Sequence, residues 1–274
     1  MRIDFHVHLA LREHMEPVPA GFCDSFWEGR GDWSALVADA KKFDEYLAAE
    51  RVDYVVGLAE VSPGVTGVTT NEYVAEAYAE TERVIKFASL NPFFEGDLYK
   101  EAHRLAALGF RGVKLYPTYQ WFYVSDERLR PFYKACEELS WPVMAHTGSS
   151  IFPGAKMKFG DPLHFDEVAV DFPGVNFLIV HGGRGLWYER AEFLAKFHDN
   201  VYLEVSGLPP QKLLEYFPAL ERISEKVVFG SDWPANPGIA ENMKRIAALG
   251  LSEEAVDNIL GGNAARLLGL KEKI

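Results

Sequence analysis

The sequence predicts a single (β/α)8 TIM barrel of the α/β class, on three observations. Short apolar runs rich in β-formers alternate with segments of helical apolar spacing, which is the pattern of βαβ units around a parallel sheet. There are eight such runs, and eight strands suit a closed barrel better than an open sheet. The chain has 274 residues, within the range of one barrel with modest insertions. We therefore predict a single barrel domain over residues 1–274.

The eight predicted strands are spread over the whole chain, each separated from the next by a segment long enough for a crossover helix. They are Ile3–His8, Tyr54–Ala59, Val84–Leu90, Gly112–Tyr116, Val143–His146, Phe177–His181, Val201–Ser206 and Val227–Ser231.

Helix start signals support the segments between the strands. Asp32 precedes an apolar series with helical spacing, and Ser125–Glu127 precedes another. Near the C-terminus, Ser252 with the two following glutamates has the form of a capping box. Residues 261–263, Gly-Gly-Asn, interrupt the C-terminal helices. We expect the helices to surround the sheet.

Two stretches do not fit the minimal repeat. Leu9–Gly31 is aromatic and carries proline and glycine, and we predict an inserted loop there, after the first strand. Pro117–Val124 holds Tyr119, Trp121, Phe122 and Tyr123 and follows the fourth strand. Loops that follow the strands of a barrel build its active-site face. Both stretches are therefore candidate walls or lids of a substrate pocket.

The composition excludes several classes of protein. Hydrophobic residues make up 48% and charged residues 25% of the chain, which is typical of a globular protein and not of a disordered or fibrous one. The formal net charge is −12 and the pI about 5.2. Binding to nucleic acid or to an anionic membrane depends on Lys and Arg, so we expect neither partner. The expected partner is a small-molecule substrate.

Cysteine content and the N-terminus favour a soluble cytoplasmic protein. Cys23 and Cys136 are too few for a disulfide framework, and the bland interpretation is two reduced thiols. The first residues lack the apolar run of a signal peptide, and no window reaches the length needed to cross a bilayer. The aromatic loops make a homodimer a reasonable expectation.

His6 and His8 in the first strand carry the strongest chemical signal. Residues two apart on a strand project to the same side, so two imidazoles face one point. A barrel interior is normally filled by branched apolar side chains, and two histidines there are costly unless something binds them. Taken alone, the pair is as consistent with hydrogen-bonded structural histidines as with a metal site.

Three later residues change that balance. His146 ends an apolar run at the fifth predicted strand, His181 ends the sixth, and Asp232 follows the eighth. Polar residues at the carboxyl ends of barrel strands are where catalytic groups are found. A shell of imidazoles and a carboxylate suits Zn²⁺, our first choice, and also Mn²⁺ or Fe²⁺.

The ordered set of motifs resembles the amidohydrolase superfamily. It comprises D-x-H-x-H at residues 4–8, His146, H-G-G at 181–183 and G-S-D-W-P at 230–234. The set is similar to the amidohydrolase-related branch that includes 2-amino-3-carboxymuconate-semialdehyde decarboxylase. The resemblance extends over residues 3–268, nearly the whole chain, and it is specific to the superfamily without indicating a substrate.

The resemblance implies roles for these residues. His6, His8 and His146 would bind one divalent metal, and Asp232 would be a further ligand that also takes a proton from bound water. His181 would then be a catalytic acid or base. The chemistry is consistent, because a divalent metal lowers the pKa of bound water enough to supply hydroxide near neutral pH.

Lys114 on the fourth predicted strand leaves the number of metals open. Binuclear members of the superfamily carry a carboxylated lysine on this strand that bridges two metals, and His146 and His181 would then hold the second one. Alternatively Lys114 binds a substrate anion or pairs with a carboxylate, for which Glu204 is a candidate, or it is a structural lysine. We favour one metal and a lysine that binds an anion or forms an ion pair.

Three further residues are candidate substrate-binding groups, each with a structural alternative. Glu60 follows the second strand and equally suits a solvated loop. Arg184, at the mouth of the sixth strand, could grip a carboxylate with its guanidinium or form a salt bridge at a helix start. Trp233, like Trp121, suits either a pocket wall or core packing.

The sequence thus predicts a hydrolase that uses metal-activated water on a small carboxylate, ester, lactone or amide, without an organic cofactor. The alternative is a metal-dependent non-oxidative decarboxylase, a carbon–carbon lyase acting on an unsaturated or aromatic acid. A third class is a barrel-shaped binding or regulatory protein that keeps the ligands without turnover. A second cation that grips the leaving carboxylate would favour the decarboxylase.

Overall fold

Eight parallel strands form the centre of the molecule, as predicted. The computed structural model describes residues 1–94 and 96–271. Along the sheet the order is β1-β2-β5-β6-β7-β8-β9-β10, and every neighbouring pair is parallel. The strands are β1 (Ile3–His8), β2 (Tyr54–Leu58), β5 (Val84–Ser89), β6 (Val113–Leu115), β7 (Val143–His146), β8 (Phe177–Val180), β9 (Val201–Glu204) and β10 (Val227–Val228). All eight predicted runs therefore contain a strand.

The sheet closes on itself between β10 and β1. The Phe5 amide donates to the Phe229 carbonyl at 3.0 Å, and the Asp232 amide donates to the His6 carbonyl at the same distance. The amide of His8 donates to the carbonyl of Trp233 at 2.9 Å. These bonds continue the ladder beyond the short β10, so the sheet is a barrel, confirming the predicted fold class.

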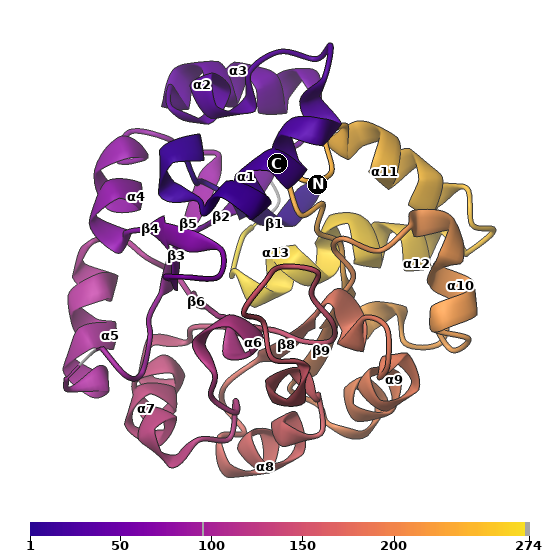
Figure 1. Cartoon of the computed structure of the whole chain (residues 1–274). Coiled ribbons are helices and arrows are strands. Elements are labelled where there is room, and N and C mark those ends of the chain that lie inside the picture. Colours follow the sequence, from indigo (N-terminus) through magenta and orange to yellow (C-terminus); the bar gives the residue numbers. More distant parts are fainter. Residues whose placement is uncertain (95, 272–274) are drawn as a thin grey trace.

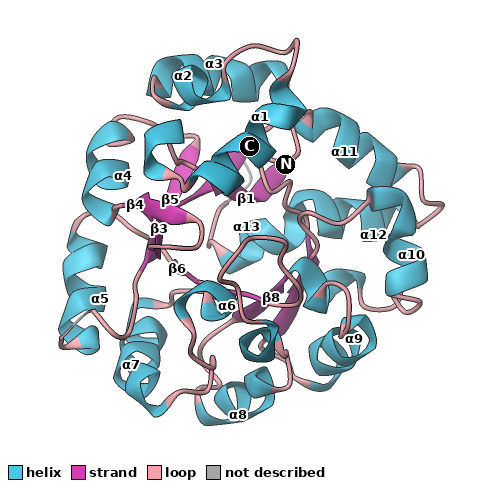
Figure 2. Ribbon diagram, in the orientation of Figure 1, coloured by secondary structure: helices cyan, strands magenta, loops and turns pink. Residues whose placement is uncertain are grey.

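Helices surround the barrel as a ring that includes α4, α5, α7, α8, α9 and α11 (Figures 1 and 2). The helices are α1 (Pro17–Trp27), α2 (Trp33–Val37), α3 (Ala40–Ala49), α4 (Asn71–Ala77), α5 (Leu98–Ala107), α6 (Pro117–Gln120), α7 (Arg130–Leu139), α8 (His164–Asp171), α9 (Tyr188–Phe197), α10 (Leu213–Tyr216), α11 (Ile239–Ala247), α12 (Glu253–Asp257) and α13 (Asn263–Leu267). The predicted caps Asp32 and Ser252 accept hydrogen bonds from the first turns of α2 and α12. At Asn258–Gly262 a π-helical turn joins α12 to α13, where the interruption was predicted.

The barrel interior is apolar at the amino ends of the strands and polar at the carboxyl ends. The apolar part contains Ile3, Phe5, Val56, Leu58, Ile85, Phe87, Met144, Leu178, Val180 and Val228. Ala264 and Leu268 from the C-terminal helix region join this cluster. The polar part contains Lys114 and Glu204, both fully buried. A larger apolar cluster joins the outward-facing side chains of the strands to the helices.

Two of the insertions contain more regular structure than we predicted. The prediction of a loop over Leu9–Gly31 was wrong, because the segment contains the short 3-10 helix Arg12–His14 and helix α1. Pro17 occupies the first turn of α1, where a proline costs no hydrogen bond. After β2 the chain forms an antiparallel hairpin, β3 (Glu60–Ser62) with β4 (Gly67–Thr69).

No helix among residues 1–94 and 96–271 combines the length and the apolar character needed to span a bilayer.

Candidate metal centre and substrate cavity

β1 presents both of its histidines to the barrel interior. The pairing of β1 with β2 shifts register between Asp4 and Val7. Phe5 therefore packs in the interior apolar cluster while Val7 packs in the outer one. His6 and His8, on either side of Val7, both line the internal cavity. The rule that residues two apart share a face holds for these two histidines. Because of the register shift, the side chains of Phe5 and His6 both face the barrel interior although the two residues are adjacent in the chain.

The donor atoms of His6, His8 and Asp232 meet at nearly equal spacing. His6 Nε2 lies 3.3 Å from His8 Nε2 and 3.3 Å from Asp232 Oδ1, and His8 Nε2 lies 3.2 Å from Asp232 Oδ1. Bonds of about 2.0–2.1 Å to a tetrahedral Zn²⁺ would separate two ligand atoms by about 3.3–3.4 Å. The three side chains thus lie at the spacing of the edges of a tetrahedral metal shell.

The position of the Asp232 carboxylate depends on the backbone conformation of Asp232 and on the space beside Gly207, which has no side chain. Its φ of 68° lies in the left-handed region, which residues other than glycine rarely adopt and which is often found at functional sites. A Cβ atom on Gly207 would lie 2.8 Å from Asp232 Oδ2. Glycine at 207 therefore leaves room for the carboxylate at the end of the strand.

Electrostatics in this group of residues favour an ionised Asp232. Burial alone would raise the pKa of the carboxyl group, but His6, His8 and His181 outweigh burial and hold the pKa well below its usual range. Burial also opposes protonation of His8, yet hydrogen bonds to Asp232 and Glu60 raise the pKa of its imidazole to about 9. For His6, burial and then the Lys114 charge lower the pKa well below its usual value.

His181 and His146 form the second part of the cluster. Their ring centroids are 4.7 Å apart, and the His181 ring lies 5.2 Å from that of His6. Burial, followed by the nearby charge of Arg184, lowers the pKa of both imidazoles well below the usual value. His146 Nε2 is buried and has no hydrogen-bond partner among the residues that the structure describes.

The structure brings His181 together with two of the predicted ligands, His6 and Asp232. His6, His181 and Asp232 each offer a donor atom within 4.8 Å of the others. Sequence reasoning gave His181 a role beside the metal and His146 a place on it. By distance alone His181 satisfies the requirement for a ligand as well. Among the described residues, all five predicted groups line one cavity.

Lys114 is buried at the centre of this polar layer. Its Nζ lies 3.2 Å from His6 Nε2 and 4.8 Å from the centre of the Tyr116 ring. Burial lowers the pKa of Lys114 to about 8, although the charge of Glu204 opposes this effect. Burial raises the pKa of Glu204 to about 7, opposed by Lys114. The Glu204 carboxylate makes its hydrogen bonds with His6, His181 and Ser206. The suggested pair with Lys114 is therefore a coulombic interaction between the two charges without a hydrogen bond.

A cavity of about 280 Å³ lies at the carboxyl ends of the strands, and all five predicted metal-site residues and Lys114 line it. The polar floor carries the histidines, Lys114 and Asp232. The walls are largely apolar and come from α1, from the loop after β7 and from the end of the barrel: Met15, Pro19, Phe22, Cys23, Ile151, Phe152, Pro234 and Ala235. Phe22 and Phe152 meet edge to face at 5.7 Å. The segment after β1 is therefore a wall of the cavity, as we expected of it.

Two predicted substrate-binding residues, Glu60 and Arg184, lie in the cavity wall. Glu60 Oε2 is 3.4 Å from His8 Nδ1, and its Oε1 accepts a hydrogen bond from Thr66. The Arg184 guanidinium donates to the Ser149 carbonyl through Nε at 3.2 Å and Nη2 at 3.0 Å. Both side chains are thus oriented by neighbours within the cavity.

The structure places Trp233 and Trp121 outside the cavity lining. Trp233 is fully buried and packs against Trp27, Phe43 and Tyr46 in the outer cluster. Its indole follows the left-handed residue 232 and points away from the substrate side. Trp121 is 44% exposed. We therefore propose no substrate contact for either tryptophan.

Sequence reasoning missed several groups in and around the site. Tyr116, Thr66, Ser149 and Ser150 line the cavity. Tyr116 lies two residues after Lys114, so the period-two rule could have found it. Ser206, which that rule places on the same face as Glu204, connects the histidines His6 and His181. Thr66 arrives on the β3–β4 hairpin, which the sequence pattern of the barrel does not require.

Comparisons with known proteins give the same fold. An uncharacterised TIM-barrel protein from Bordetella bronchiseptica aligns with a TM-score of 0.77 and 24% identity over 98% of both chains. A 5-carboxyvanillate decarboxylase from Novosphingobium aromaticivorans, complexed with manganese and 4-hydroxy-3-methoxy-5-nitrobenzoic acid, aligns with a TM-score of 0.71 and 17% identity over 98% of this chain and 96% of that chain. For a probable 2-pyrone-4,6-dicarboxylic acid hydrolase from Acinetobacter baumannii with bound citric acid, the TM-score is 0.67 and the identity 18%, over 98% and 99% of the two chains.

The model of the amidohydrolase family matches residues 3–270 of the sequence. This match covers nearly the whole chain and includes every motif from which the resemblance was argued. The solved structures with the same fold include both decarboxylases and a probable hydrolase. The chain is an enzyme of the amidohydrolase family, in its amidohydrolase-related branch.

Proposed function

We propose that this enzyme is a metal-dependent hydrolase of a small carboxylate, ester, lactone or amide. The observation that carries the proposal is the near-equal spacing of 3.2–3.3 Å among His6 Nε2, His8 Nε2 and Asp232 Oδ1. Three donors at this spacing suit a single divalent ion, and one of them is a carboxylate that stays ionised at neutral pH. Such a carboxylate accepts the proton that a water molecule must lose before it attacks an acyl carbon.

The donor set fits the metal. His146 supports the assignment, because a buried Nε2 without a hydrogen bond is costly unless a ligand satisfies it. We assign His6, His8, His146 and Asp232 to one ion, with Zn²⁺ first and Mn²⁺ or Fe²⁺ as alternatives. When bound, the ion would lower the pKa of water and polarise the substrate carbonyl. A second ion is the alternative if Lys114 is carboxylated.

Proton transfer falls to Asp232 and His181. Asp232 is ionised at neutral pH, since its pKa is held well below the usual range, and its free carboxylate oxygen can accept a proton from water. His181 is neutral at physiological pH because burial lowers its pKa, so it can accept that proton and deliver it to the leaving group. Both groups lie within 4.8 Å of His6, and the transfer stays within the buried end of the cavity.

The cavity wall indicates the kind of substrate. A volume of about 280 Å³ admits a small molecule and excludes a folded polymer chain. Lys114 and Arg184 supply two positive charges, and Glu60 supplies an acceptor beside His8. We assign the two cations to a carboxylate of the substrate and the apolar wall to its carbon skeleton.

The second candidate function is non-oxidative decarboxylation of an unsaturated or aromatic acid. Lys114 and Arg184 support it equally, because both line the same cavity and one of them could hold the carboxylate that leaves while the other neutralises the remaining charge. The same apolar wall would hold a flat ring.

One experiment separates the two reactions. The metal-loaded enzyme is incubated in ¹⁸O-labelled water with panels of lactones and of carboxymuconate-type acids, and products are analysed by mass spectrometry and for released CO2. Hydrolysis places ¹⁸O in the product carboxylate without CO2. Release of CO2 with no ¹⁸O in the organic product would overturn the hydrolase proposal. The Asp232→Asn variant measures the background of both signals.

A further inference from the structure

We propose that Glu204, the last residue of strand β9, and Ser206, two residues beyond it, are positioning residues that hold the Nδ1 proton on His6, so that its Nε2 faces the metal site with a free lone pair. This inference rests on the proposed metal-dependent function but concerns two residues to which the comparisons give no role. Both side chains are fully buried and neither lines the cavity. They act through His6 and touch no substrate.

The hydroxyl group of Ser206 lies at the junction of three side chains. Its Oγ is 2.8 Å from His6 Nδ1, 3.0 Å from His181 Nδ1 and 2.8 Å from Glu204 Oε2. A hydroxyl has one proton to donate and two lone pairs that accept. The hydroxyl proton goes to Glu204 Oε2, because the two oxygens of Glu204 are acceptors here and also accept from the backbone amides of Ser206 and His181. The two imidazoles must then donate to Ser206, and each carries its proton on Nδ1.

The backbone fixes His181 independently of the hydroxyl group. His181 Nδ1 lies 2.9 Å from the carbonyl oxygen of Ser206, which can only accept. This contact requires a proton on Nδ1 and leaves Nε2 as the basic nitrogen. For His6, by contrast, both acceptors are side chains, Ser206 Oγ and Glu204 Oε2, the latter at 3.3 Å. Of the two histidines, only His6 therefore has a tautomer that depends on the side chains of Ser206 and Glu204.

On the opposite side, His6 Nε2 faces one donor and one acceptor. The Nζ of Lys114 lies at 3.2 Å, and an ammonium group only donates, so a lone pair on Nε2 suits that contact. Asp232 Oδ1 lies at 3.3 Å and favours an N–H on the same nitrogen, so the partners of Nδ1 decide the tautomer. In the metal-bound protein the same lone pair would face the ion. Carboxylate partners of this kind orient metal-binding histidines and raise their basicity.

The carboxylate is itself held rigidly. Glu204 Oε1 accepts from the Ser206 amide at 3.0 Å, and Oε2 accepts from the His181 amide at 3.3 Å. Gly230, two residues beyond β10, leaves the space that this arrangement needs. A Cβ atom there would overlap Glu204 Oε1 and would lie 2.6 Å from the Cβ of His6. Only a residue without a side chain therefore fits beside the carboxylate and His6.

The test reads tautomers in the metal-free protein and so needs no activity. In ¹⁵N-labelled protein, long-range ¹H–¹⁵N correlations show which ring nitrogen of each histidine is protonated, with His6 and His181 assigned from single His→Gln variants. We expect Nδ1–H for both in the wild type. Ser206→Ala should weaken this preference at His6, and Ser206→Ala with Glu204→Gln should abolish it. His181 should stay Nδ1–H in both variants because its carbonyl partner remains.

Metal affinity gives the second readout. We expect the dissociation constant for Mn²⁺, measured by competition with a chelator, to rise about tenfold to a hundredfold in Ser206→Ala. Ser206→Thr keeps the hydroxyl group and should restore both the tautomer and the affinity, which distinguishes positioning from packing. Circular dichroism verifies that each variant is folded.

An unchanged His6 tautomer together with an unchanged Mn²⁺ affinity in the double variant would overturn the inference. Loss of the Nδ1 proton from His181 as strongly as from His6 would overturn it too, because a general distortion would then be the cause. Failure of the proposed function looks different: the wild type would show the expected tautomers and yet turn over none of the substrate panels.

Discussion

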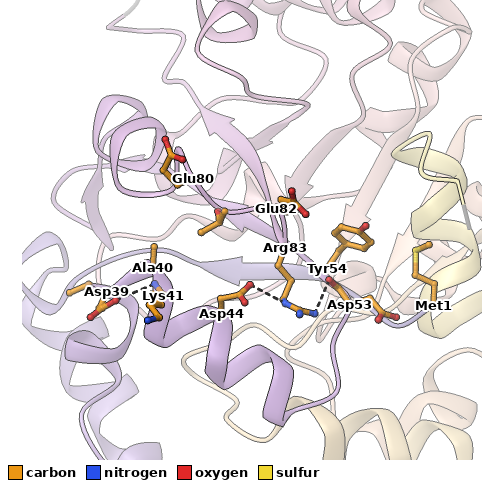
Figure 3. A pocket seen from close by; sticks show the side chains of 12 residues that line it. Met1, Asp39, Ala40, Lys41, Asp44, Asp53, Tyr54, Glu80, Glu82 and Arg83 are labelled. Carbon is orange, nitrogen blue, oxygen red and sulfur yellow. Dashed lines mark hydrogen bonds and ion pairs between the residues drawn. The ribbon is translucent and has the colours of Figure 1, made fainter. Parts of the chain in front are cut away.

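Two pockets lie at opposite ends of the barrel, and they differ in what surrounds their charged side chains. The internal cavity at the carboxyl ends of the strands measures about 280 Å³, and buried histidines, Lys114 and Asp232 converge on it. A wider pocket of about 1130 Å³ lies beside the amino ends of β1, β2 and β5 (Figure 3). It is lined by Met1, Ala38, Asp39, Ala40, Lys41, Asp44, Asp53, Tyr54, Glu80, Thr81, Glu82 and Arg83.

The difference teaches that volume is a poor guide to function here. In the wider pocket Arg83 pairs with Asp44 at 3.0 Å and donates to the Val52 and Asp53 carbonyls. Both side chains of the pair are partly exposed, so water screens their charges. In the small cavity, burial leaves the charges unscreened and shifts several pKa values at once. Convergence of such groups marks a chemical site, whereas a larger open hollow supports only local structure.

The largest effect should come from loss of the metal ligands. We expect His8→Ala to lower kcat/KM by about a thousandfold or more, because a bound divalent ion contributes several kcal/mol to a developing charge. Treatment with a chelator should do the same to the wild type, and added Mn²⁺ or Zn²⁺ should reverse it. Metal content is measured by mass spectrometry of the element.

His103→Ala is the matched control for this experiment, because that imidazole is 41% exposed and pairs with Glu138 on the outside. It should keep both metal and activity. A His8→Ala protein with full activity would contradict the metal-centre assignment.

The barrel fold and the location of the candidate site at the carboxyl ends of the strands could be predicted from the sequence. The directions in which individual side chains point could not. The eight strands follow from apolar runs, since buried parallel strands need them. His6 and His8 could be found from their spacing on one strand, and His146 and Asp232 because they lie at or just after the ends of such runs. Trp233 was placed wrongly as a substrate contact, since the left-handed Asp232 turns the chain and sends the indole into the core. Backbone angles of this kind have no signal in a single sequence.

Helix α1 was missed for a related reason. Residues 17–27 contain two prolines, a glycine and several aromatic residues, so local propensity predicts a loop. Its buried side, which includes Cys23 and Trp27, packs on the barrel, and the Trp27 indole donates to the Pro234 carbonyl at 2.9 Å. Tertiary contacts thus stabilise a helix that propensity does not favour, and the same helix supplies a wall of the cavity.

A second prediction tests whether Lys114 serves the substrate or the metal. We expect Lys114→Met to raise KM for a carboxylate substrate about tenfold to a hundredfold, because a hydrogen bond to a charged group contributes about 1.5–3 kcal/mol. Metal content should stay at one ion per chain. Steady-state kinetics and elemental analysis check both.

Lys86→Met is the control for Lys114→Met, since Lys86 lies on β5 and its Nζ donates to the Leu108 carbonyl outside the cavity. It should leave KM unchanged. A fall from two ions to one in Lys114→Met, with wild-type protein heavier by one CO2, would instead favour the carboxylated lysine.

A third prediction concerns the pH dependence of metal binding. The pKa of His8 is raised to about 9 by Asp232 and Glu60, against the effect of burial. Below pH 9 a metal must therefore displace a proton from His8, and the Mn²⁺ dissociation constant should fall about tenfold per pH unit between pH 6 and 8. The stability of the metal-free fold changes with pH in the opposite direction to the metal affinity. A raised histidine pKa stabilises the fold at low pH, and this contribution is lost as the pH rises through about 9.

Titration calorimetry in two buffers counts the protons released. Glu60→Gln removes one negative charge beside His8 and should move the whole dependence to lower pH. Binding of Mn²⁺ with no pH dependence and no proton release would contradict the raised pKa of His8.

The smallest effect should come from the wide pocket. Arg83→Met removes a guanidinium that bonds Asp44 and two backbone carbonyls, and we expect a loss of about 0.5–1.5 kcal/mol in the free energy of unfolding. Asp44→Asn, which breaks only the exposed ion pair, should cost less, about 0–1 kcal/mol. Neither variant should change kcat/KM or metal content, because the pocket lies at the opposite end of the barrel. Urea denaturation and the kinetic assay together test this, and a large loss of activity at unchanged stability would show that the amino-terminal pocket takes part in the reaction.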